Sequence, residues 1–558
     1  MSGSVGSPSP PSPLPPARER GVPQTRDGVR ALHPRARALG YDLPPLTGLR
    51  KGRTHEEDFS GETSDSGRWR PIGDLSYNCV SAMRTFHLLS FGCRASQADG
   101  AAIKRQLLES GLQEVEDVAT SQVAILNTCT VTARADAEVR QLVRRIHRAN
   151  PLCRILVTGC YAQRSPAEIT QLGGVAWVVG NSHKHLIADL LGSSRRQESG
   201  VRSQKSGAIG QTGLVRIPPS EANPAGSNEL FEHMLAPAAQ PGTPRRSMIL
   251  VGEIGDEFHF APVFPDDRTR PTLKIQDGCN ARCSFCVIPS VRGRSRSLAP
   301  EKVVEQVHEL AQSGYKEIVL SGINLGSYGR DIDRRISFLG LLERLLEETA
   351  IARLRISSIE PMDVSPALIR LVAQEPRLAQ HLHIPLQSGC GRILRLMNRR
   401  YWPSQYAERI LAIREQIPNA AIGADVMVGF PGETDQDHAA SVAFIESLPF
   451  TYLHIFPYSA RPHTPAAASP NQVNGRVARE RAQGIRALLA RKRQTFLQAQ
   501  IGGKLSAVTL DESETNERVA LSSNYLKIVL PGSNLPPNTL LDIQVGRVHE
   551  GLLFGFPA

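Results

Sequence analysis

Strand and helix patterns alternate regularly over residues 271–465, and this alternation is what most limits the possible folds. The candidate strands lie at residues 272–276, 316–321, 353–358, 380–385, 421–427 and 451–456. The first helical pattern between them, Glu301–Gln312, stops before Gly314, where a C-cap glycine belongs. Six strand–helix units predict a partial barrel that is open on one side. Active sites in such barrels lie at the carboxyl ends of the strands.

A smaller α/β pattern precedes the barrel, within residues 83–193. Its predicted strands are apolar runs typical of a buried parallel sheet: Phe86–Phe91, Val123–Leu126, Ile155–Val157 and Ala176–Val179. The helical patterns Ala101–Leu108 and Asp136–Arg148 alternate with these strands. This order predicts a Rossmann-like α/β domain.

The remaining segments differ in composition. Ten of the first fifty residues are proline, so we expect residues 1–82 to be disordered, or to precede a true start at Met83. Residues 194–269 are rich in Gly, Ser, Pro and Arg, and are interpreted as a linker or insertion. Residues 270–498 contain the barrel and end with an Arg-rich helix. Short strand patterns over residues 499–558, such as KLSAVTL and LKIVL, predict a small terminal β-barrel.

Composition narrows the class of protein. No apolar run approaches the ~18 residues that a membrane span needs, and residues 1–30 lack a signal-peptide core, so we expect a cytosolic protein with no membrane partner. The formal net charge of +11 permits a polyanionic partner such as RNA. Nine cysteines in 558 residues are too few for a disulfide scaffold. Clustered cysteines in a cytosolic chain indicate metal binding or catalysis instead.

The cysteine loop Cys279-Asn-Ala-Arg-Cys283-Ser-Phe-Cys286 directly follows the first predicted barrel strand. Three thiolates can hold three irons of a four-iron cluster and leave the fourth iron open to a ligand. A zinc site is the alternative, but it requires four closed ligands, or three with water. The loop offers no fourth Cys or His nearby, because His308 belongs to the next predicted helix. The pattern therefore favours an iron–sulfur cluster.

Three further cysteines, Cys93, Cys129 and Cys160, each end a predicted strand of the first α/β region. The carboxyl ends of parallel strands meet at one edge of a sheet, so these thiols are expected to converge there. They could hold a second cluster that also has an open iron. The alternative is that they are buried structural cysteines. Cys79, Cys153 and Cys390 fit neither pattern and are interpreted as structural or incidental.

These residues together resemble the radical S-adenosylmethionine methylthiotransferases. The stretches FGCRASQADG, NTCTVTARAD, VTGCYAQ and LKIQDGCNARCSFCVIPSVRGRSRS are similar to the branch that acts on threonylcarbamoyl-adenosine in transfer RNA. So are GYKEIVLSGINLGSYG, RISSIEP, HLHIPLQSG, MNRRY, DVMVGFPGET and HIFPYSARPHTPAA. The terminal segment resembles the small RNA-binding (TRAM-like) barrel of these enzymes. The chain departs from the family at Arg94, Ala95 and Ser96, where Lys-Val-Asn is common, and at His463, where glycine is usual.

The resemblance implies two [4Fe-4S] clusters and S-adenosyl-L-methionine as cofactors. The Cys279/Cys283/Cys286 cluster would bind S-adenosylmethionine, accept an electron from a reductant protein, and so yield a 5′-deoxyadenosyl radical that removes hydrogen from adenine carbon 2. The Cys93/Cys129/Cys160 cluster would carry the sulfur, which a second S-adenosylmethionine methylates. The implied product is the 2-methylthio derivative of threonylcarbamoyl-adenosine next to the anticodon.

Further residues at predicted strand ends are expected to contact S-adenosylmethionine. They are Phe285, Ser321, Gly322, Gln387, Gly429 and Gly432, with Ser388 and Gly389 as comparable candidates. A core aromatic or a turn glycine is the alternative interpretation for each of them. Basic residues are expected to contact RNA phosphates: Arg140, Arg144, Arg145 and Arg148 on one helix, and Arg292, Arg294 and Arg296 after the cysteine loop.

Two other functions compete with this interpretation. Within the family, the substrate could instead be isopentenyl-adenosine or an aspartate of a ribosomal protein. From another class, the chain could be a non-catalytic RNA-binding protein stabilised by zinc, which would contain zinc and no iron.

Overall fold

The computed structural model describes residues 83–192, 247–256, 269–512 and 517–558. The expectation for residues 1–82 and most of that for residues 194–269 fall outside the described residues. Within the described part of the chain, no helix combines the length and the apolar character that crossing a membrane requires.

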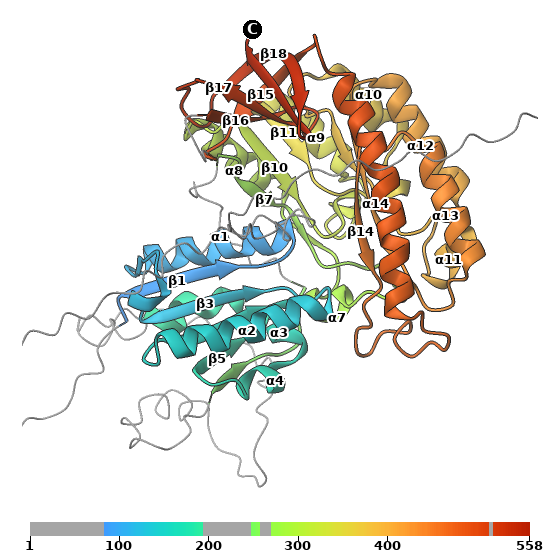
Figure 1. The fold of residues 1–558 in the computed structure, drawn as a ribbon. Helices are drawn as coiled ribbons and strands as arrows, with labels where there is room; N and C mark the ends of the chain where they lie inside the picture. Colours follow the sequence, from blue (N-terminus) through green and yellow to red (C-terminus); the bar gives the residue numbers. More distant parts are fainter. Residues whose placement is uncertain (1–82, 193–246, 257–268, 513–516) are drawn as a thin grey trace, which may run out of the picture. The chain divides into compact units, whose positions relative to one another are not determined.

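A parallel sheet of six strands forms the first α/β region, in the order β2-β1-β3-β4-β5-β6 (Figure 1). The strands are β1 (Thr85–Ser90), β2 (Gln113–Glu114), β3 (Val123–Thr128), β4 (Arg154–Gly159), β5 (Val175–Val179) and β6 (Met248–Leu250). Four of them confirm the predicted apolar runs. The short strand β6 comes from the range interpreted as a linker, and it pairs in parallel with β5.

Helices cover both faces of this sheet, as Figure 1 shows. They are α1 (Arg94–Glu109) and α5 (Ile187–Gly192) on one face, and α2 (Ala133–Ala149), α3 (Cys160–Arg164) and α4 (Pro166–Thr170) on the other. Alternate residues of β3 explain the two faces, since Val123 packs with α1 and Ala124 packs with α2. Two short 3₁₀ segments, η1 (Val118–Thr120) and η2 (Lys184–Leu186), complete the region.

Helix α1 begins at Arg94, earlier than the predicted Ala101. Its first turns contain Gly100. Glycine has a low helix propensity, so the sequence pattern does not predict a helix before this residue. The glycine is needed because α1 crosses the sheet closely: a Cβ atom at Gly100 would lie 1.9 Å from the Oγ of Ser90. Close packing therefore overrides the low helix propensity.

The six predicted barrel strands are all present. They are β7 (Thr272–Lys274), β10 (Glu317–Ser321), β11 (Arg353–Ile356), β12 (His381–His383), β13 (Ala421–Val428) and β14 (Tyr452–Pro457). They form two parallel sheets, β11-β10-β7 and β12-β13-β14, which parallel bridges such as Ser358 to His383 connect. This arrangement is the predicted partial barrel. The short antiparallel pair β8 (Gln276–Asp277) and β9 (Arg296–Ser297) follows β7.

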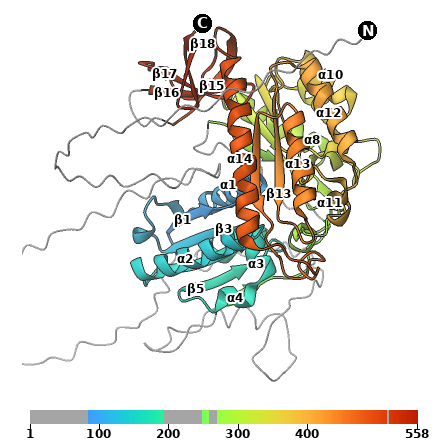
Figure 2. The same cartoon turned by 45° about the vertical axis from the view of Figure 1, so that its right-hand side comes forward.

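Helices surround the barrel strands. They are α7 (Ile288–Arg292), α8 (Pro300–Gln312), α9 (Phe338–Glu348), α10 (Pro366–Gln374), α11 (Gly391–Leu396), α12 (Pro403–Gln416), α13 (Asp435–Ser447) and α14 (Gly475–Gln498), with 3₁₀ segments η5 (Leu325–Ser327) and η6 (Pro361–Asp363). Apart from α7, whose Val291 packs with Cys160 in a separate cluster, the apolar faces of the helices share one core with the strands. The long helix α14 packs along β14 and leads to the terminal strands (Figure 2).

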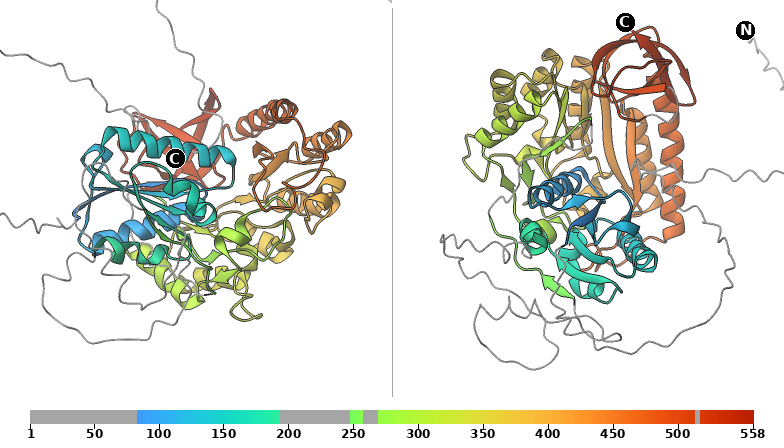
Figure 3. Two further views of the ribbon diagram at one scale, coloured as in Figure 1. Left: turned by 90° about the horizontal axis from the view of Figure 1, so that it is seen from below. Right: turned by 90° about the vertical axis from the view of Figure 1, so that its left-hand side faces the viewer.

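The terminal strands close into a barrel in the order β15-β16-β17-β19-β18 (Figure 3). They are β15 (Lys504–Thr509), β16 (Glu517–Ser522), β17 (Lys527–Pro531), β18 (Leu540–His549) and β19 (Leu552–Pro557). The predicted small β-barrel is therefore confirmed, and β19 is an addition to the predicted strands.

The turn between β16 and β17 docks against the base of the partial barrel. The buried guanidinium of Arg355 donates to the backbone oxygens of Ser522 and Ser523 at 3.0 Å each. The ring of Tyr525 stacks on His381 with the ring centroids 4.2 Å apart. The phenol oxygen of Tyr525 also accepts a hydrogen bond of 3.2 Å from Arg94 of α1. One turn thus contacts both α/β regions.

Candidate active site

The loop with Cys279, Cys283 and Cys286 follows β8, at the carboxyl end of the first barrel strand, where the sequence places it. Gly278 enters the loop with a φ of +71°, and a Cβ atom there would lie 1.9 Å from the backbone oxygen of Arg294. The loop is closed by hydrogen bonds from the backbone N–H of Cys279 to Gly293 and from that of Cys286 to Cys283, each 3.1 Å long. Close backbone packing therefore fixes the path of the cysteine loop.

Hydrogen-bond donors surround the three sulfur atoms of this loop. Backbone N–H groups of Ala281 and Ile288 donate to Cys279 Sγ at 3.3 Å and to Cys286 Sγ at 3.5 Å. The side chain of Arg399 donates to Cys283 Sγ at 3.4 Å and to the carboxylate of Glu360 at 2.5 Å. Donors of this kind stabilise negatively charged sulfur, as the thiolates of an iron–sulfur cluster require.

The second set of cysteines lies at the carboxyl ends of three neighbouring strands. Cys93 is the N-cap of α1 just after β1, while Cys129 directly follows β3 and Cys160 directly follows β4. Because β1, β3 and β4 are adjacent in the sheet, the three thiols converge, and after burial the nearby Cys93 and Cys160 also raise the pKa of Cys129. Gly92 permits the approach: its φ is +103°, and a Cβ atom there would lie 2.5 Å from the Cβ of Cys129.

The two sets of cysteines lie close to each other. Cys160 packs in one apolar cluster with Val287 and Val291, which follow Cys286 along the chain. The side chain of Asn181 connects the same elements, since its Nδ2 lies 3.4 Å from Cys160 Sγ and 2.7 Å from the backbone oxygen of Val291. The first sheet therefore presents its thiols to the cysteine loop of the barrel.

Both sets of thiols suit iron–sulfur clusters. Burial raises the pKa of Cys129 and of Cys286 to about 12, so the metal-free thiols are neutral and metal binding displaces their protons. Among the described residues, no three His, Cys, Asp or Glu side chains are arranged to hold a single metal ion.

Phe285, an expected cofactor contact, is a partly buried residue of the cysteine loop. Its ring meets that of Phe430 edge-on, with centroids 6.4 Å apart. Ser321 is buried at the end of β10, and Gly322 follows it. A Cβ atom at Gly322 would lie 2.9 Å from Leu325 and 3.0 Å from Gln276, so packing by itself accounts for this glycine.

Among the expected cofactor contacts, Gln387 has a side-chain oxygen that is free to accept a hydrogen bond. It adopts a φ of +62° and is buried, and its Oε1 atom has no hydrogen-bond partner among the described residues. A buried oxygen of this kind requires a donor, which a bound cofactor can supply. Gly429 has a structural role, because a Cβ atom there would lie 2.5 Å from the Cβ of Ala478. Gly432 has a φ of +81°, and a Cβ atom there would find its nearest contact, Leu396, at 3.8 Å.

Comparisons with known proteins agree with this geometry. Residues 273–445 match the family model of the radical SAM superfamily. Residues 85–180 match the model described as "Uncharacterized protein family UPF0004". The chain is 34% identical to the threonylcarbamoyladenosine tRNA methylthiotransferase MtaB of Aquifex aeolicus over 79% of this chain and 96% of the relative. It is 35% identical to MtaB of Bacillus subtilis, over 80% of this chain and 90% of the relative.

The chain belongs to the radical SAM methylthiotransferase family. A second kind of relative is the tRNA-2-methylthio-N(6)-dimethylallyladenosine synthase of Syntrophobacter fumaroxidans. It is 33% identical over 70% of this chain and 77% of its own length. The methylthiotransferase family is therefore established, while the identities to its two branches are similar.

Three side chains of this methylthiotransferase contact the thiols but were not predicted. They are Arg399, Asn181 and Asn324, the last with its Nδ2 4.0 Å from Cys279 Sγ. Arg399 lies within the MNRRY stretch quoted for the family resemblance, which is the signal that could have found it. Asn324 likewise lies within the quoted stretch GYKEIVLSGINLGSYG, whereas Asn181 follows the predicted strand that ends at Val179, outside every quoted stretch.

Two of the three arginines after the cysteine loop that were expected to contact RNA phosphates are buried, so that prediction is wrong for them. Arg292 is buried and ion-paired with Asp99 and Asp277, and Arg296 is also buried, with its Nη1 bonded to the backbone oxygen of Gly255. Neither can meet RNA in this arrangement, because burial has replaced water with protein partners. Arg294 is exposed, and its contact with RNA phosphate stays a prediction.

On α2, the arginines predicted to face RNA divide into two groups. Arg144, Arg145 and Arg148 are exposed. Arg140 donates to Tyr161 Oη at 2.9 Å and to Glu168 at 2.7 Å. Its charge is therefore paired with a carboxylate of the same chain.

The cysteines outside both sets have local partners where they are described. Cys153 is buried beside Ser121, with Sγ and Oγ 3.4 Å apart, and Cys390 Sγ lies 3.2 Å from a carboxylate oxygen of Asp437. These contacts agree with the structural interpretation. Cys79 lies outside the described residues.

Proposed function

We propose that this methylthiotransferase modifies transfer RNA, converting threonylcarbamoyl-adenosine next to the anticodon into its 2-methylthio derivative. The relatives from Aquifex aeolicus and Bacillus subtilis carry that substrate in their names and align with about four-fifths of this chain. The stretches NTCTVT and SSIEP favour the same branch by resemblance.

The observation that carries the proposal is the meeting of the two cysteine sets. We assign one [4Fe-4S] cluster to Cys279, Cys283 and Cys286 and a second to Cys93, Cys129 and Cys160. The contact of Cys160 with Val287 and Val291 supports this assignment, because a sulfur-carrying group must lie near the centre where the radical forms. A one-electron reductant protein completes the proposed set of partners.

When bound, S-adenosylmethionine and the clusters supply the radical, the methyl group and the added sulfur. The protein's own residues hold and orient these groups. Arg399 and the backbone N–H groups of Ala281 and Ile288 direct positive charge at the first set of sulfurs. Phe285, Ser321, Gly322, Gln387, Gly429 and Gly432 remain our proposed contacts to S-adenosylmethionine. The side chains supply the environment, and the chemistry belongs to the cofactors.

An exposed surface of the terminal barrel suits RNA. The ring of Phe556 on β19 is 58% exposed, and the neighbouring strand β18 contributes exposed Arg547, whose guanidinium lies 5.0 Å from the ring centroid of Phe554. Unpaired bases stack on exposed aromatic rings and on arginine, while arginine also meets phosphate. Together with Arg144, Arg145 and Arg148 of α2, this surface is our proposed contact with the transfer RNA.

The nucleoside assignment can be tested in a strain that lacks the gene. Liquid chromatography with mass detection should show loss of methylthio-threonylcarbamoyl-adenosine and accumulation of its unmethylthiolated precursor. The wild-type gene should restore the product, whereas a Cys279→Ala variant should not. Loss of the methylthio derivative of isopentenyl-adenosine instead would assign the chain to the other branch.

The cluster assignment has its own test. Anaerobically reconstituted protein should bind about eight irons, and a Cys93/Cys129/Cys160→Ala variant should bind about four, because each set of thiols holds one four-iron cluster. About four irons in both proteins would remove the second cluster from the proposal. A colourless protein that contains zinc would instead support the RNA-binding alternative.

A further inference from the structure

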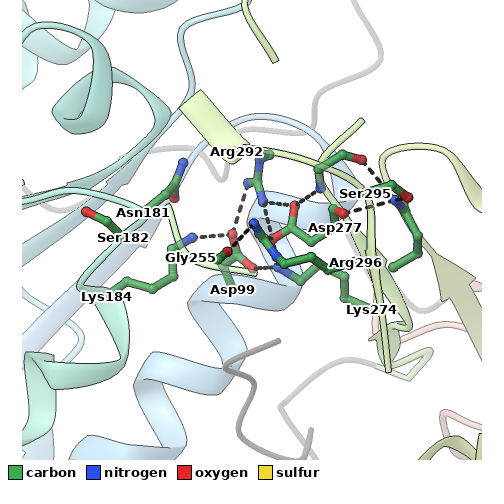
Figure 4. Close-up of polar contacts among 12 residues, drawn as sticks. Asp99, Asn181, Ser182, Lys184, Gly255, Lys274, Asp277, Arg292, Ser295 and Arg296 are labelled. Carbon is green, nitrogen blue, oxygen red and sulfur yellow. Dashed lines mark hydrogen bonds and ion pairs between the residues drawn. The ribbon is translucent and has the colours of Figure 1, made fainter. Parts of the chain in front are cut away.

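Five buried ionisable side chains form a network where the first sheet meets the barrel (Figure 4). The carboxylate of Asp99, from α1, accepts hydrogen bonds from Lys184 and Lys274 at 2.5 Å each and from Arg292 at 2.9 Å. The carboxylate of Asp277, two residues before Cys279, accepts from Lys274 at 2.6 Å and from Arg292 at 2.9 Å. Arg292 therefore bridges one carboxylate from each α/β region.

Positive charges outnumber negative charges in this network. Three cations face two carboxylates, and none of the five side chains is more than 10% exposed. A fourth cation, Arg296, lies 3.9 Å from Asp277. Buried charge is costly unless an opposite charge balances it. The network is therefore suited to a neighbouring anion.

Arg292 lies close to the second set of cysteines through the contacts of its chain neighbour. It directly follows Val291, whose side chain packs with Cys160. The side-chain amide of Asn181 donates both to the backbone oxygen of Val291 and to the sulfur of Cys160. The buried Nε of Arg292 has no hydrogen-bond partner among the described residues.

We propose that Arg292, held in place by Asp99 and Asp277, is a positioning residue whose charge balances the anionic group bound by Cys93, Cys129 and Cys160 and favours its reduced state. The inference rests on the proposed second cluster. One-electron reduction adds a negative charge to a cluster, and a buried cation stabilises that charge more strongly than it would in water. Charge and hydrogen bonding around a cluster set its reduction potential.

Two substitutions alter the charge of the network in opposite directions. Arg292→Gln removes one positive charge but leaves both carboxylates paired with lysines, with Arg296 still near Asp277, so folding should be preserved. Asp99→Asn leaves three cations opposite one carboxylate and makes the network more positive. A charge effect therefore predicts opposite shifts of the cluster's potential, whereas a general loss of packing predicts shifts in one direction.

The experiment isolates the second cluster. In a Cys279/Cys283/Cys286→Ala parent, reconstituted anaerobically, a dithionite titration followed by electron paramagnetic resonance gives the midpoint potential, and iron is counted in parallel. Arg292→Gln should disfavour reduction at least tenfold, a shift of about 59 mV to more negative potential for one electron. Asp99→Asn should shift the potential to a more positive value, and Arg292→Lys should remain closer to the parent than Arg292→Gln.

Arg355→Gln is the matched control, because Arg355 is equally buried and pairs with the carboxylate of Glu317 at 2.7 Å. Its potential should equal that of the parent. Unchanged potentials in both network variants, or shifts in the same direction, would overturn the inference. Loss of iron from Arg292→Gln alone supports a role of the charge, while equal loss from Arg292→Lys contradicts it. A parent without iron would instead remove the second cluster, and the inference with it.

Discussion

The Nη1 of Arg461 donates hydrogen bonds to the carboxylate of Asp136 at 2.7 Å and to the backbone oxygen of Thr130 at 3.1 Å. Arg461 follows the last barrel strand, whereas Thr130 follows Cys129 in the first α/β region. Asp136 is buried and also accepts a hydrogen bond of 2.8 Å from Arg164. This contact joins the loop that follows Cys129 to the segment that follows the last barrel strand.

Replacing Arg461 should loosen this contact without abolishing it. Arg461→Gln should lower the free energy of unfolding of the apoprotein by about 1–3 kcal/mol, because Asp136 keeps Arg164 as a partner. Asp136→Asn should cost more, about 3–5 kcal/mol, because it leaves two arginines without their carboxylate. Urea denaturation measures both. The exposed Arg335→Gln serves as the control and should change stability by less than about 0.5 kcal/mol; equal losses in the first two variants would contradict the argument.

A methyl group at Gly92 should remove the second cluster alone. In Gly92→Ala the new Cβ would lie 2.5 Å from the Cβ of Cys129, so the iron content should fall from about eight to about four. Gly314→Ala is the matched control: its φ of +92° is similar, but a Cβ there meets nothing within 4 Å. This variant bears the same backbone strain and should keep all its iron. Loss of iron from both variants would attribute the effect to strain.

Protonation of Glu317 at acidic pH should lower the free energy of unfolding. Burial alone would raise the pKa of this carboxyl, but Arg355, Arg270 and Arg353 lower it from 4.5 to about 2. A carboxyl whose pKa is lower in the folded than in the unfolded protein stabilises the fold at any pH above its unfolded pKa. This contribution is lost as the pH falls from 4.5 toward 2. The wild type should therefore lose about 3 kcal/mol more than Glu317→Gln over that range. Urea denaturation of both apoproteins at several pH values measures the difference, and parallel curves would contradict it.

Phe556 should contribute to the affinity for transfer RNA by stacking. Phe556→Ala should weaken binding about tenfold to a hundredfold and leave its salt dependence unchanged. Arg547→Gln should instead reduce the salt dependence, because it removes a phosphate contact. Fluorescence anisotropy at several salt concentrations distinguishes the two effects. Leu552→Ala, a substitution at another exposed residue of β19, is the control and should bind like the wild type.

Much of this architecture could be predicted, because parallel strands buried on both faces are continuous apolar runs. The convergence of Cys93, Cys129 and Cys160 follows from the same rule, since equivalent ends of parallel strands share an edge. Strand β2 escaped prediction because its two residues, Gln113 and Glu114, carry no apolar signal.

The role of Arg292 could not be predicted from its neighbours. In sequence it is one of several arginines after a cysteine loop, a pattern that equally indicates a phosphate contact. Its burial depends on Asp99, which lies 193 residues away along the chain. Only the folded arrangement of the two α/β regions reveals that pairing. His463 is a similar case. Its backbone is left-handed, with a φ of +65°, a conformation that the glycine usual at this position of the family adopts easily and that a histidine would not predict.

The turn at Ser522 and Tyr525 limits how freely the terminal barrel can be exchanged between related enzymes. Cutting the chain after α14 would remove the two backbone oxygens that accept hydrogen bonds from the buried Arg355, which would keep only Glu317 as a partner. A chimera with a foreign terminal barrel would fold well only if the incoming turn offered the same carbonyl oxygens and a comparable ring over His381. An exchange would therefore be easier for the outer strands, where we propose the RNA contacts, than for the inward turn, which has to match the catalytic half.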